Sequence, residues 1–140
     1  MRFLTVLGTL ACLLAAAAHA GTTQANALRC SSQSIGPGSI VRHNSGGARC
    51  FLTAYRNHCQ AASYELSVFG IDTIATRHFA DERSARSCVI AVQTTFRVVP
   101  QRPHVTGQGT CRTLRADSSA IVAIGCRGQG LTSSLSLTGV

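Results

Sequence analysis

Cysteines provide the clearest chemistry in this 140-residue chain, and six of its seven lie beyond residue 20. These six are Cys30, Cys50, Cys59, Cys88, Cys111 and Cys126. A zinc site would be expected to use a closely spaced pair such as Cys-x-x-Cys, and the chain has none. An even number of cysteines in a small secreted chain is instead typical of a disulfide framework. We therefore predict three disulfides, no metal and no cofactor, and the sequence leaves all fifteen possible pairings open.

Acid–base catalysis is the second chemistry that the composition allows. Beyond residue 20 the histidines are His43, His58, His78 and His104, and the acids are Glu65, Asp72, Asp81, Glu82 and Asp117. None of them forms a catalytic spacing such as His-Glu-x-x-His. A small hydrolase of RNA or wall polysaccharide would require folding to bring a histidine and a carboxylate together in a cleft. We expect no catalytic residue and no enzymatic activity, and we keep such a hydrolase as the alternative.

The first twenty residues predict a secretory signal peptide. Arg2 precedes an apolar run over residues 4–18, and Ala18-His19-Ala20 is a small-x-small cleavage site. The apolar run is shorter than the roughly 20 residues that a membrane-spanning helix needs. We therefore expect a secreted, extracellular protein with a single cysteine-rich domain over residues 21–140.

The predicted domain is basic. The chain has thirteen arginines, no lysine and five acids, so removal of Arg2 leaves twelve positive and five negative charges, a net charge of +7. Such a charge attracts a protein to anionic wall polymers, lipid head groups or nucleic acid. Because the arginines are scattered and aromatic residues are few, no specific nucleic-acid interface is expected.

Alternation of apolar and polar residues predicts most of the strands. Tyr64, Leu66 and Val68 alternate with polar residues in a first strand over 63–68, and 73–79 predicts a second strand after a bend. Residues 87–99 alternate most clearly and end at Pro100. Residues 131–137 predict a closing strand, and 39–43 fit either a strand or a loop. Residues 80–86 predict an exposed turn, or else a helix capped by Asp81.

A helix is predicted over residues 48–62. Phe51, Leu52, Tyr55 and Cys59 follow the spacing of one apolar helix face. Because Cys50 is about half a revolution away from Cys59, the two cannot both face the sheet. We expect Cys59 to point inward and Cys50 to bond a flanking segment, with Cys30 the nearest candidate.

A second helix is predicted over residues 107–127. Apolar residues recur there at helical spacing between Cys111 and Cys126, and Thr110 is a plausible cap. The alternative is a pair of strands that turn at Asp117-Ser118. Gly107-Gln-Gly-Thr110 could hold an anion at a helix N-terminus, but we interpret it as a hinge. The predicted fold is α+β, a small disulfide-rich α/β-sandwich with an antiparallel sheet and two helices on one face.

The chain resembles the small secreted killer toxins first known from a virus of smut fungi. The resemblance lies in Arg29-Cys30-Ser-Ser-Gln33, Cys88-Val-Ile-Ala-Val-Gln93 and Thr110-Cys-Arg-Thr-Leu114, and continues in Ile124-Gly-Cys-Arg127 and the segment 131–137. It implies an antiparallel sheet of about five strands with two antiparallel helices, laced by disulfides. It also implies inhibition of competing fungi, by interference with calcium channels in the best-understood member.

A second resemblance concerns the necrosis-inducing effectors of plant-pathogenic fungi. It lies in Cys88-Val-Ile-Ala-Val-Gln-Thr-Thr95, together with the preceding Cys50 helix and the strand over 63–68. Together, the two resemblances imply a fungal toxin or virulence effector that binds a target-cell surface component without catalysis. We expect the partner to be a cell-surface protein or channel of a target or host cell, or an anionic wall or membrane surface, and we expect a monomer. A passive wall-associated basic protein is the remaining alternative.

Overall fold

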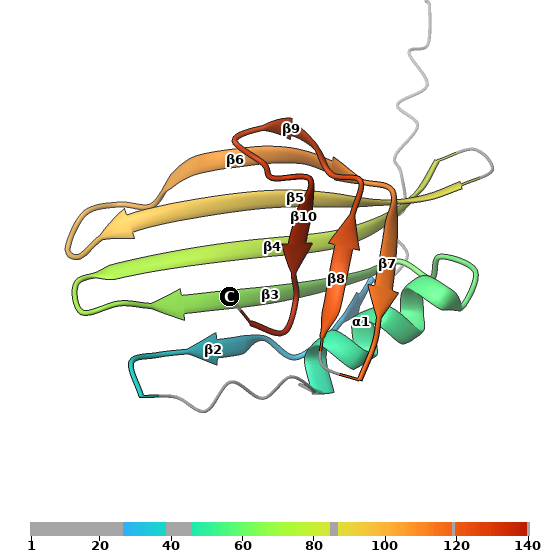
Figure 1. The fold of residues 1–140 in the computed structure, drawn as a ribbon, viewed down its shortest axis with the longest axis horizontal. Coiled ribbons are helices and arrows are strands. Elements are labelled where there is room, and N and C mark those ends of the chain that lie inside the picture. The colour runs from blue at the N-terminus through green and yellow to red at the C-terminus, as the bar shows by residue number, and fades with distance from the viewer. Residues whose placement is uncertain (1–26, 39–45, 85–86, 119, 140) are drawn as a thin grey trace, which may run out of the picture.

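The computed structural model describes residues 27–38, 46–84, 87–118 and 120–139. The predicted signal peptide and the segment 39–43 lie outside these residues. In chain order (Figure 1) the elements are β1 (Leu28–Arg29), β2 (Gln33–Ile35), α1 (Gly46–Arg56), β3 (Ala62–Phe69), β4 (Thr73–Ser84), β5 (Ser87–Val98), β6 (His104–Cys111), β7 (Thr113–Ala116), β8 (Ile121–Ile124), β9 (Arg127–Gln129) and β10 (Ser134–Ser136).

Seven strands form one large sheet. Their order is β1-β3-β4-β5-β6-β9, with β2 also paired to β3. The neighbours from β3 to β9 are antiparallel, whereas β1 and β2 run parallel to β3. The strands predicted at 63–68, 73–79 and 87–99 are confirmed as β3, β4 and β5. Strand β4 continues to Ser84, so residues 80–84 are strand and not the predicted turn, and the helix capped by Asp81 is wrong.

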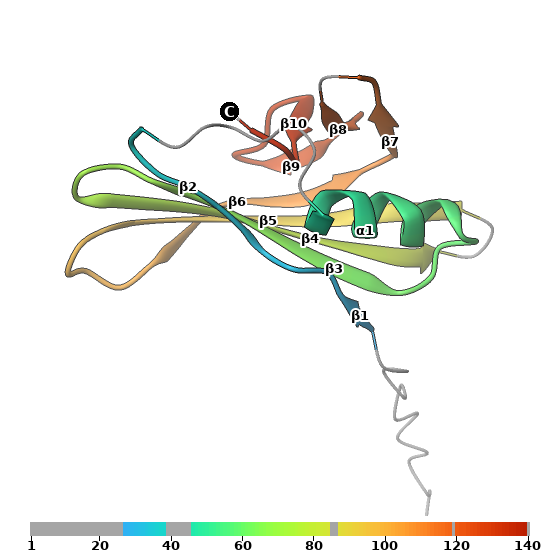
Figure 2. The same cartoon turned by 90° about the horizontal axis from the view of Figure 1, so that it is seen from below.

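One face of the large sheet is covered by two different elements. Strands β7, β8 and β10 form a separate three-stranded antiparallel sheet. Figure 2 shows this small sheet and α1 on the same side of the large sheet, whose opposite face carries no further layer among the described residues. The closing strand predicted at 131–137 is confirmed in its middle as β10, but it pairs with β8 of the small sheet.

The core lies between the large sheet and these two covering elements. Phe51 of α1, Tyr64 of β3 and Phe79 of β4 form a buried aromatic trio with ring centroids 6.2–6.4 Å apart. Aliphatic side chains of the small sheet, including Leu114, Ile121 and Leu135, belong to the same buried cluster. The covered face of the large sheet is therefore mostly apolar, as alternation in its strands predicts.

The second helix predicted over 107–127 is wrong, and the strand alternative is confirmed. This segment contains β6, β7 and β8, and β7 pairs with β8 around a turn at Asp117. The Asp117 N–H donates to the Ala120 carbonyl oxygen, and the Asp117 carboxylate accepts from the Ala120 N–H. The helix prediction failed because the apolar residues of this segment fit a helical period as well as a strand period. Its β-branched residues and polar turn favour a hairpin.

The helix that does form is shorter at its C-terminus than predicted. It ends at Arg56, because His58 and Cys59 adopt positive φ angles of 54° and 57°. A left-handed backbone cannot continue a right-handed helix. The fold is thus mostly β-sheet with one helix in the described part of the chain, and the predicted two-helix α/β-sandwich is not what the structure contains.

Candidate functional site

Three disulfides brace the fold, and all six predicted cysteines take part. Cys30 bonds Cys50, which confirms the predicted link between the helix start and its nearest flanking cysteine. Cys59 bonds Cys88, and Cys111 bonds Cys126. The Cα atoms of Cys111 and Cys126 are 3.8 Å apart, whereas fifteen residues of helix would separate them by about 22 Å. This bond by itself excludes the second helix.

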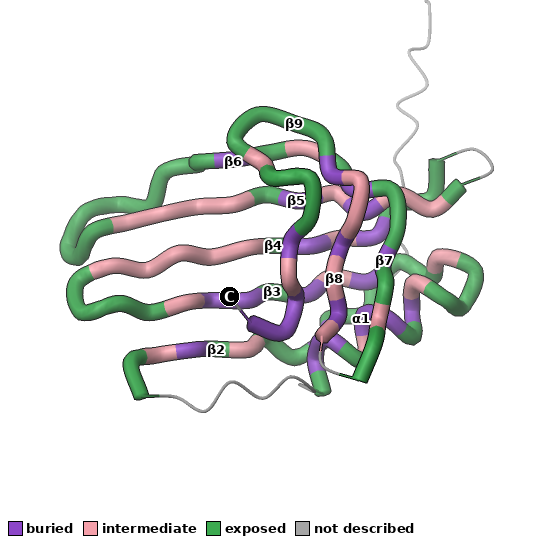
Figure 3. The backbone as a smooth tube through the Cα atoms, in the orientation of Figure 1, coloured by how far each residue is buried: buried purple, intermediate pink, exposed green. Residues whose placement is uncertain are grey.

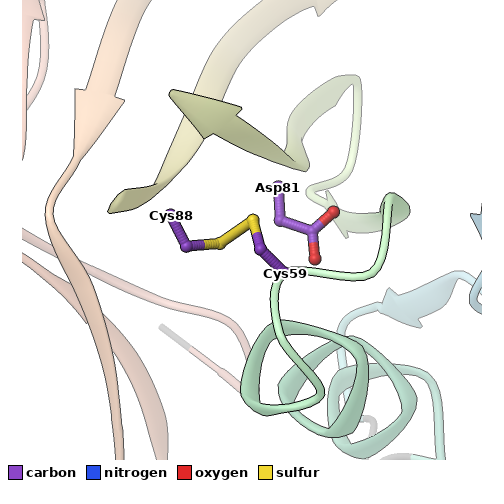
Figure 4. Close-up of side chains that lie close together, drawn as sticks. All are labelled: Cys59, Asp81 and Cys88. Atoms are coloured by element: carbon purple, nitrogen blue, oxygen red, sulfur yellow. A yellow bond between two sulfur atoms is a disulfide. The ribbon is translucent and has the colours of Figure 1, made fainter. Parts of the chain in front are cut away.

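The Cys59–Cys88 disulfide differs from the other two in its surroundings. It joins the turn after α1 to the start of β5, and neither of its cysteines is buried. Cys111 and Cys126 are both buried, and so is Cys30. Cys59 therefore points neither into the core nor along a helix face, contrary to the inward position predicted for it. Figure 4 shows the carboxylate of Asp81 beside this disulfide.

Asp81 is a buried acid on the covered face of β4. Only 5% of its surface is exposed. One carboxylate oxygen, Oδ1, accepts a hydrogen bond from the backbone N–H of Ala62, whereas Oδ2 is buried with no hydrogen-bond partner among the described residues. Loss of hydration raises the pKa of this carboxyl group, and the backbone hydrogen bonds oppose that shift. Sequence reasoning missed Asp81 as a site residue because its neighbours come from distant parts of the chain.

The donor atoms of Cys59, Asp81 and Cys88 lie within 4.8 Å of one another, which is close enough to suggest a metal site. The two sulfurs, however, are bonded to each other. Zinc binds cysteine as the thiolate, so the oxidised protein offers only one carboxylate ligand here. The cluster is therefore better suited to disulfide chemistry than to metal binding.

A hollow of about 500 Å³ adjoins the same disulfide on its outer side. It is lined by Cys59 and Cys88 together with the side chains of Arg56, His58 and Arg83. The Arg83 guanidinium also donates a hydrogen bond to the backbone carbonyl oxygen of His58, which ties β4 to the turn that carries Cys59. The disulfide is thus flanked by a buried acid on one side and by basic groups on the other.

The open face of the large sheet carries a polar row across its strands. Glu65 of β3 lies opposite His78 of β4, and His78 lies opposite Gln93 of β5. Glu65, His78 and Arg29 line a hollow of about 710 Å³ beside β1. Folding therefore brings a histidine and a carboxylate together, which is the condition set above for a hydrolase.

The remaining histidines do not meet this condition. His58 lies in the turn after α1, and His104 begins β6, where its ring makes an edge contact with Phe96. His43 lies outside the described residues. The hinge predicted at residues 107–110 is wrong, and so is the alternative of an anion cradle, because these residues belong to β6 and no helix begins there. For the same reason Thr110 is not a helix cap.

Exposed apolar side chains gather at the end of the large sheet farthest from α1. Figure 3 shows burial concentrated beneath α1 and the small sheet, and exposed loops at the opposite end. Five of the six large apolar side chains exposed in the described part of the chain form this apolar tip: Phe69, Ile71, Val98, Val99 and Val105. The loop between β3 and β4 lies next to the loop between β5 and β6, because the Val99 N–H donates to the Asp72 carbonyl oxygen at 2.8 Å. Sequence reasoning missed this feature, although an isoleucine in the turn 70–72 is an unusual signal.

The comparisons with known proteins add no relative. No family model matches the chain, no curated protein matches it, and no solved structure matches it. Among the described residues, no helix has the length and apolar character needed to cross a membrane. The resemblances to killer toxins and necrosis-inducing effectors therefore stay predictions from short sequence motifs.

Proposed function

We propose that the protein is an exported toxin or effector that binds the anionic membrane surface of a target cell through its apolar tip, without catalysis. The observation that carries this proposal is the gathering of exposed apolar side chains at one end of the sheet. Ile71 is 93% exposed at the tip of the β3–β4 hairpin. Hairpin turns favour Gly, Asn, Asp and Ser, and an isoleucine this exposed buries almost no apolar surface within the fold.

The charges around the apolar tip favour an anionic lipid surface as its partner. Arg97 and Arg102 lie beside the tip, with Asp72 as the nearby acid. Apolar side chains flanked by basic ones are the combination that binds the interface of a lipid bilayer. Each arginine close to an anionic leaflet contributes roughly 1 kcal/mol. The three disulfides and the predicted signal peptide support export, since disulfides are typical of oxidising compartments.

Vesicle sedimentation tests the membrane proposal. The protein should sediment with vesicles that contain phosphatidylserine and much less with vesicles of phosphatidylcholine alone. Ile71→Asp should lower this binding about ten-fold or more, because an apolar side chain loses roughly 1.5–3 kcal/mol of burial. Leu28→Asp is the matched control, since Leu28 is the exposed large apolar side chain away from the tip. Equal binding to both vesicles, or equal effects of both substitutions, would overturn the proposal.

Cell assays test the toxin or effector part separately. Purified protein is added to fungal cultures and to plant leaves, with and without external calcium, and growth inhibition and necrosis are scored. We expect one of these responses, and we expect Ile71→Asp to weaken it. Absence of both growth inhibition and necrosis would contradict the proposal of a toxin or effector. Cell binding that protease treatment abolishes, with no binding to vesicles, would replace the lipid surface by a protein receptor.

A small secreted hydrolase is the second candidate, and the Glu65–His78 pair is the observation that favours it. A carboxylate and an imidazole on neighbouring strands can act as base and acid in the hydrolysis of RNA or a polysaccharide. Release of acid-soluble nucleotides or reducing sugars is the readout. His78→Asn and Glu65→Gln should each abolish such activity, whereas the control His58→Asn, at a histidine outside this hollow, should not. No release by the wild-type protein removes this candidate.

A further inference from the structure

The Cys59–Cys88 disulfide is the one most open to attack among the three. Both of its cysteines are partly exposed and line a hollow of about 500 Å³. In the Cys111–Cys126 disulfide, by contrast, the cysteines are only 1% and 8% exposed. In the Cys30–Cys50 disulfide only Cys50 is partly exposed, because Cys30 is buried. Thiol–disulfide exchange needs an approach of the attacking sulfur along the S–S bond, so access decides which bond reacts first. Geometry therefore selects Cys59–Cys88.

The hollow beside this disulfide favours an anionic thiol. Arg56, His58 and Arg83 line it, and no Asp or Glu among the described residues does. Positive groups near a disulfide attract a negatively charged thiol and also stabilise the thiolate that leaves. A hollow of this volume admits a small molecule rather than a folded domain.

Asp81 completes the site from the inner side. Its carboxylate lies within 4.8 Å of both sulfurs, and its Oδ2 has no hydrogen-bond partner among the described residues. A carboxylate that is 5% exposed and lacks a partner for one oxygen is costly in its charged form, which favours the protonated carboxyl group. One carboxylate oxygen lies within 4.8 Å of both sulfurs (Figure 4), so a small movement as the bond opens would bring a proton on Asp81 to a departing sulfur.

We propose that the Cys59–Cys88 disulfide is a site of exchange with an anionic low-molecular-weight thiol, with Asp81 as the proton donor to the departing sulfur. This inference is independent of the membrane proposal, because the apolar tip lies at the other end of the large sheet. The left-handed backbone at His58 and Cys59 adds to it. Non-glycine residues in this region store backbone strain, here in the turn that carries Cys59.

The exchange balances in two steps. A thiolate attacks one protein sulfur, a mixed disulfide forms and the Cys59–Cys88 bond breaks. The electron pair moves to the departing sulfur, which takes the proton from Asp81 and leaves a carboxylate. A second thiolate then attacks the mixed disulfide, releases the oxidised low-molecular-weight disulfide and frees the second cysteine as a thiolate, which takes its proton from solvent. One protein disulfide and two thiols thus become one protein dithiol and one small disulfide, and solvent returns the proton to Asp81.

Disulfide-resolved reduction kinetics test the proposal. The oxidised protein is incubated with glutathione, an anionic thiol, or with mercaptoethanol, a neutral one, and free thiols are trapped with an alkylating reagent. Peptide mass spectrometry without further reduction then gives the opening rate of each disulfide. We expect Cys59–Cys88 to open at least about ten-fold faster than Cys111–Cys126 and faster than Cys30–Cys50. Opening of either other bond first, or of all three together, would overturn the site.

Variants of two helix arginines test the selectivity for an anionic thiol. Arg56→Gln should slow the reaction with glutathione about five-fold and leave the reaction with mercaptoethanol unchanged. Arg49→Gln is the matched control, because Arg49 lies on the same helix and outside this hollow. Equal effects of both substitutions on glutathione would show that net charge, and not the hollow, sets the rate.

Variants of two neighbouring acids test the proton donor. Asp81→Asn should slow opening of Cys59–Cys88 about ten-fold or more with both thiols, whereas Glu82→Gln, at the next, exposed position of β4, should not. A rate unchanged by Asp81→Asn would overturn the role of Asp81. Should Asp81→Asn not fold, the wild-type rate per mercaptoethanol thiolate is measured against pH. A neutral thiol is used because Arg56, His58 and Arg83 also face the site and would alter the attraction of an anionic one. A rate that falls as the pH rises supports Asp81 as the proton donor. A rate that does not change with pH overturns this role.

Discussion

The hydroxyl of Tyr64 donates a 2.8 Å hydrogen bond to the backbone carbonyl oxygen of Leu137. Tyr64 is 1% exposed and Leu137 is fully buried, so the bond lies inside the core. It joins β3 of the large sheet to the chain just after β10 of the small sheet. This contact spans 73 residues of sequence and holds together the two sheets that enclose the core.

Removal of that hydroxyl should destabilise the fold. Tyr64→Phe leaves the buried Leu137 carbonyl oxygen without this donor, and an unmet hydrogen bond of this kind costs about 1–3 kcal/mol. The measurement is the free energy of unfolding in urea. Tyr55→Phe is the matched control, because its hydroxyl makes a longer 3.4 Å bond to the Arg112 carbonyl oxygen at an exposed position. Similar losses for the two variants would contradict the importance of the Tyr64–Leu137 bond.

Stability should fall as the pH rises through the titration of Asp81. Burial raises the pKa of this carboxyl group in the folded protein, so the folded state holds its proton more tightly than the unfolded state does. The resulting stabilisation is complete below the unfolded pKa of about 3.9. It is lost as the pH rises from there through the raised folded pKa.

The difference between wild type and Asp81→Asn isolates this effect from the other acids. The variant keeps an oxygen for the Ala62 N–H and cannot ionise. Urea unfolding at a series of pH values should show the wild type losing stability relative to the variant above about pH 4. A constant difference across the series would mean that Asp81 does not titrate in this window.

Loss of the Cys111–Cys126 disulfide should cost about 3 kcal/mol, the estimate for a closed loop of fifteen residues. The double substitution Cys111→Ala and Cys126→Ala also removes two buried sulfurs from the core beside the small sheet. Urea unfolding measures the loss. Hydrogen exchange at the amides of β7 and β8 should rise more than exchange in β3. Uniform exchange throughout the protein would contradict a local role for this bond.

Gly109 should tolerate no side chain. It lies opposite Gly128 in the β6–β9 pair, and a Cβ atom at 109 would lie 2.1 Å from the Arg127 carbonyl oxygen. Gly109→Ala must therefore push β9 away, and the free energy of unfolding measured in urea should fall by about 1–3 kcal/mol. Gly46→Ala at the start of α1 is the control, since its Cβ would meet open space. Equal stabilities of the two variants would contradict this crowding.

The strands of the large sheet could be predicted because alternation is a local property. Tyr64, Leu66 and Val68 each face the covered side of β3, as every second residue of a half-buried strand must. The segment 107–127 could not be assigned in the same way. Its apolar residues fit a helical stripe and a hairpin equally well, and the Cys111–Cys126 bond that separates these folds is a tertiary contact.

Composition and local pattern determined that this is a small, basic, disulfide-rich protein with an antiparallel sheet and a helix beginning near residue 48. Only the tertiary structure decided the Cys59–Cys88 and Cys111–Cys126 bonds, the small sheet, the Glu65–His78 pair, the apolar tip and the position of Asp81 beside Cys59–Cys88. The physical reason is the distance along the chain over which each signal acts. Hydrophobic period and turn residues act over a few neighbours, whereas sites form from side chains that only packing brings together.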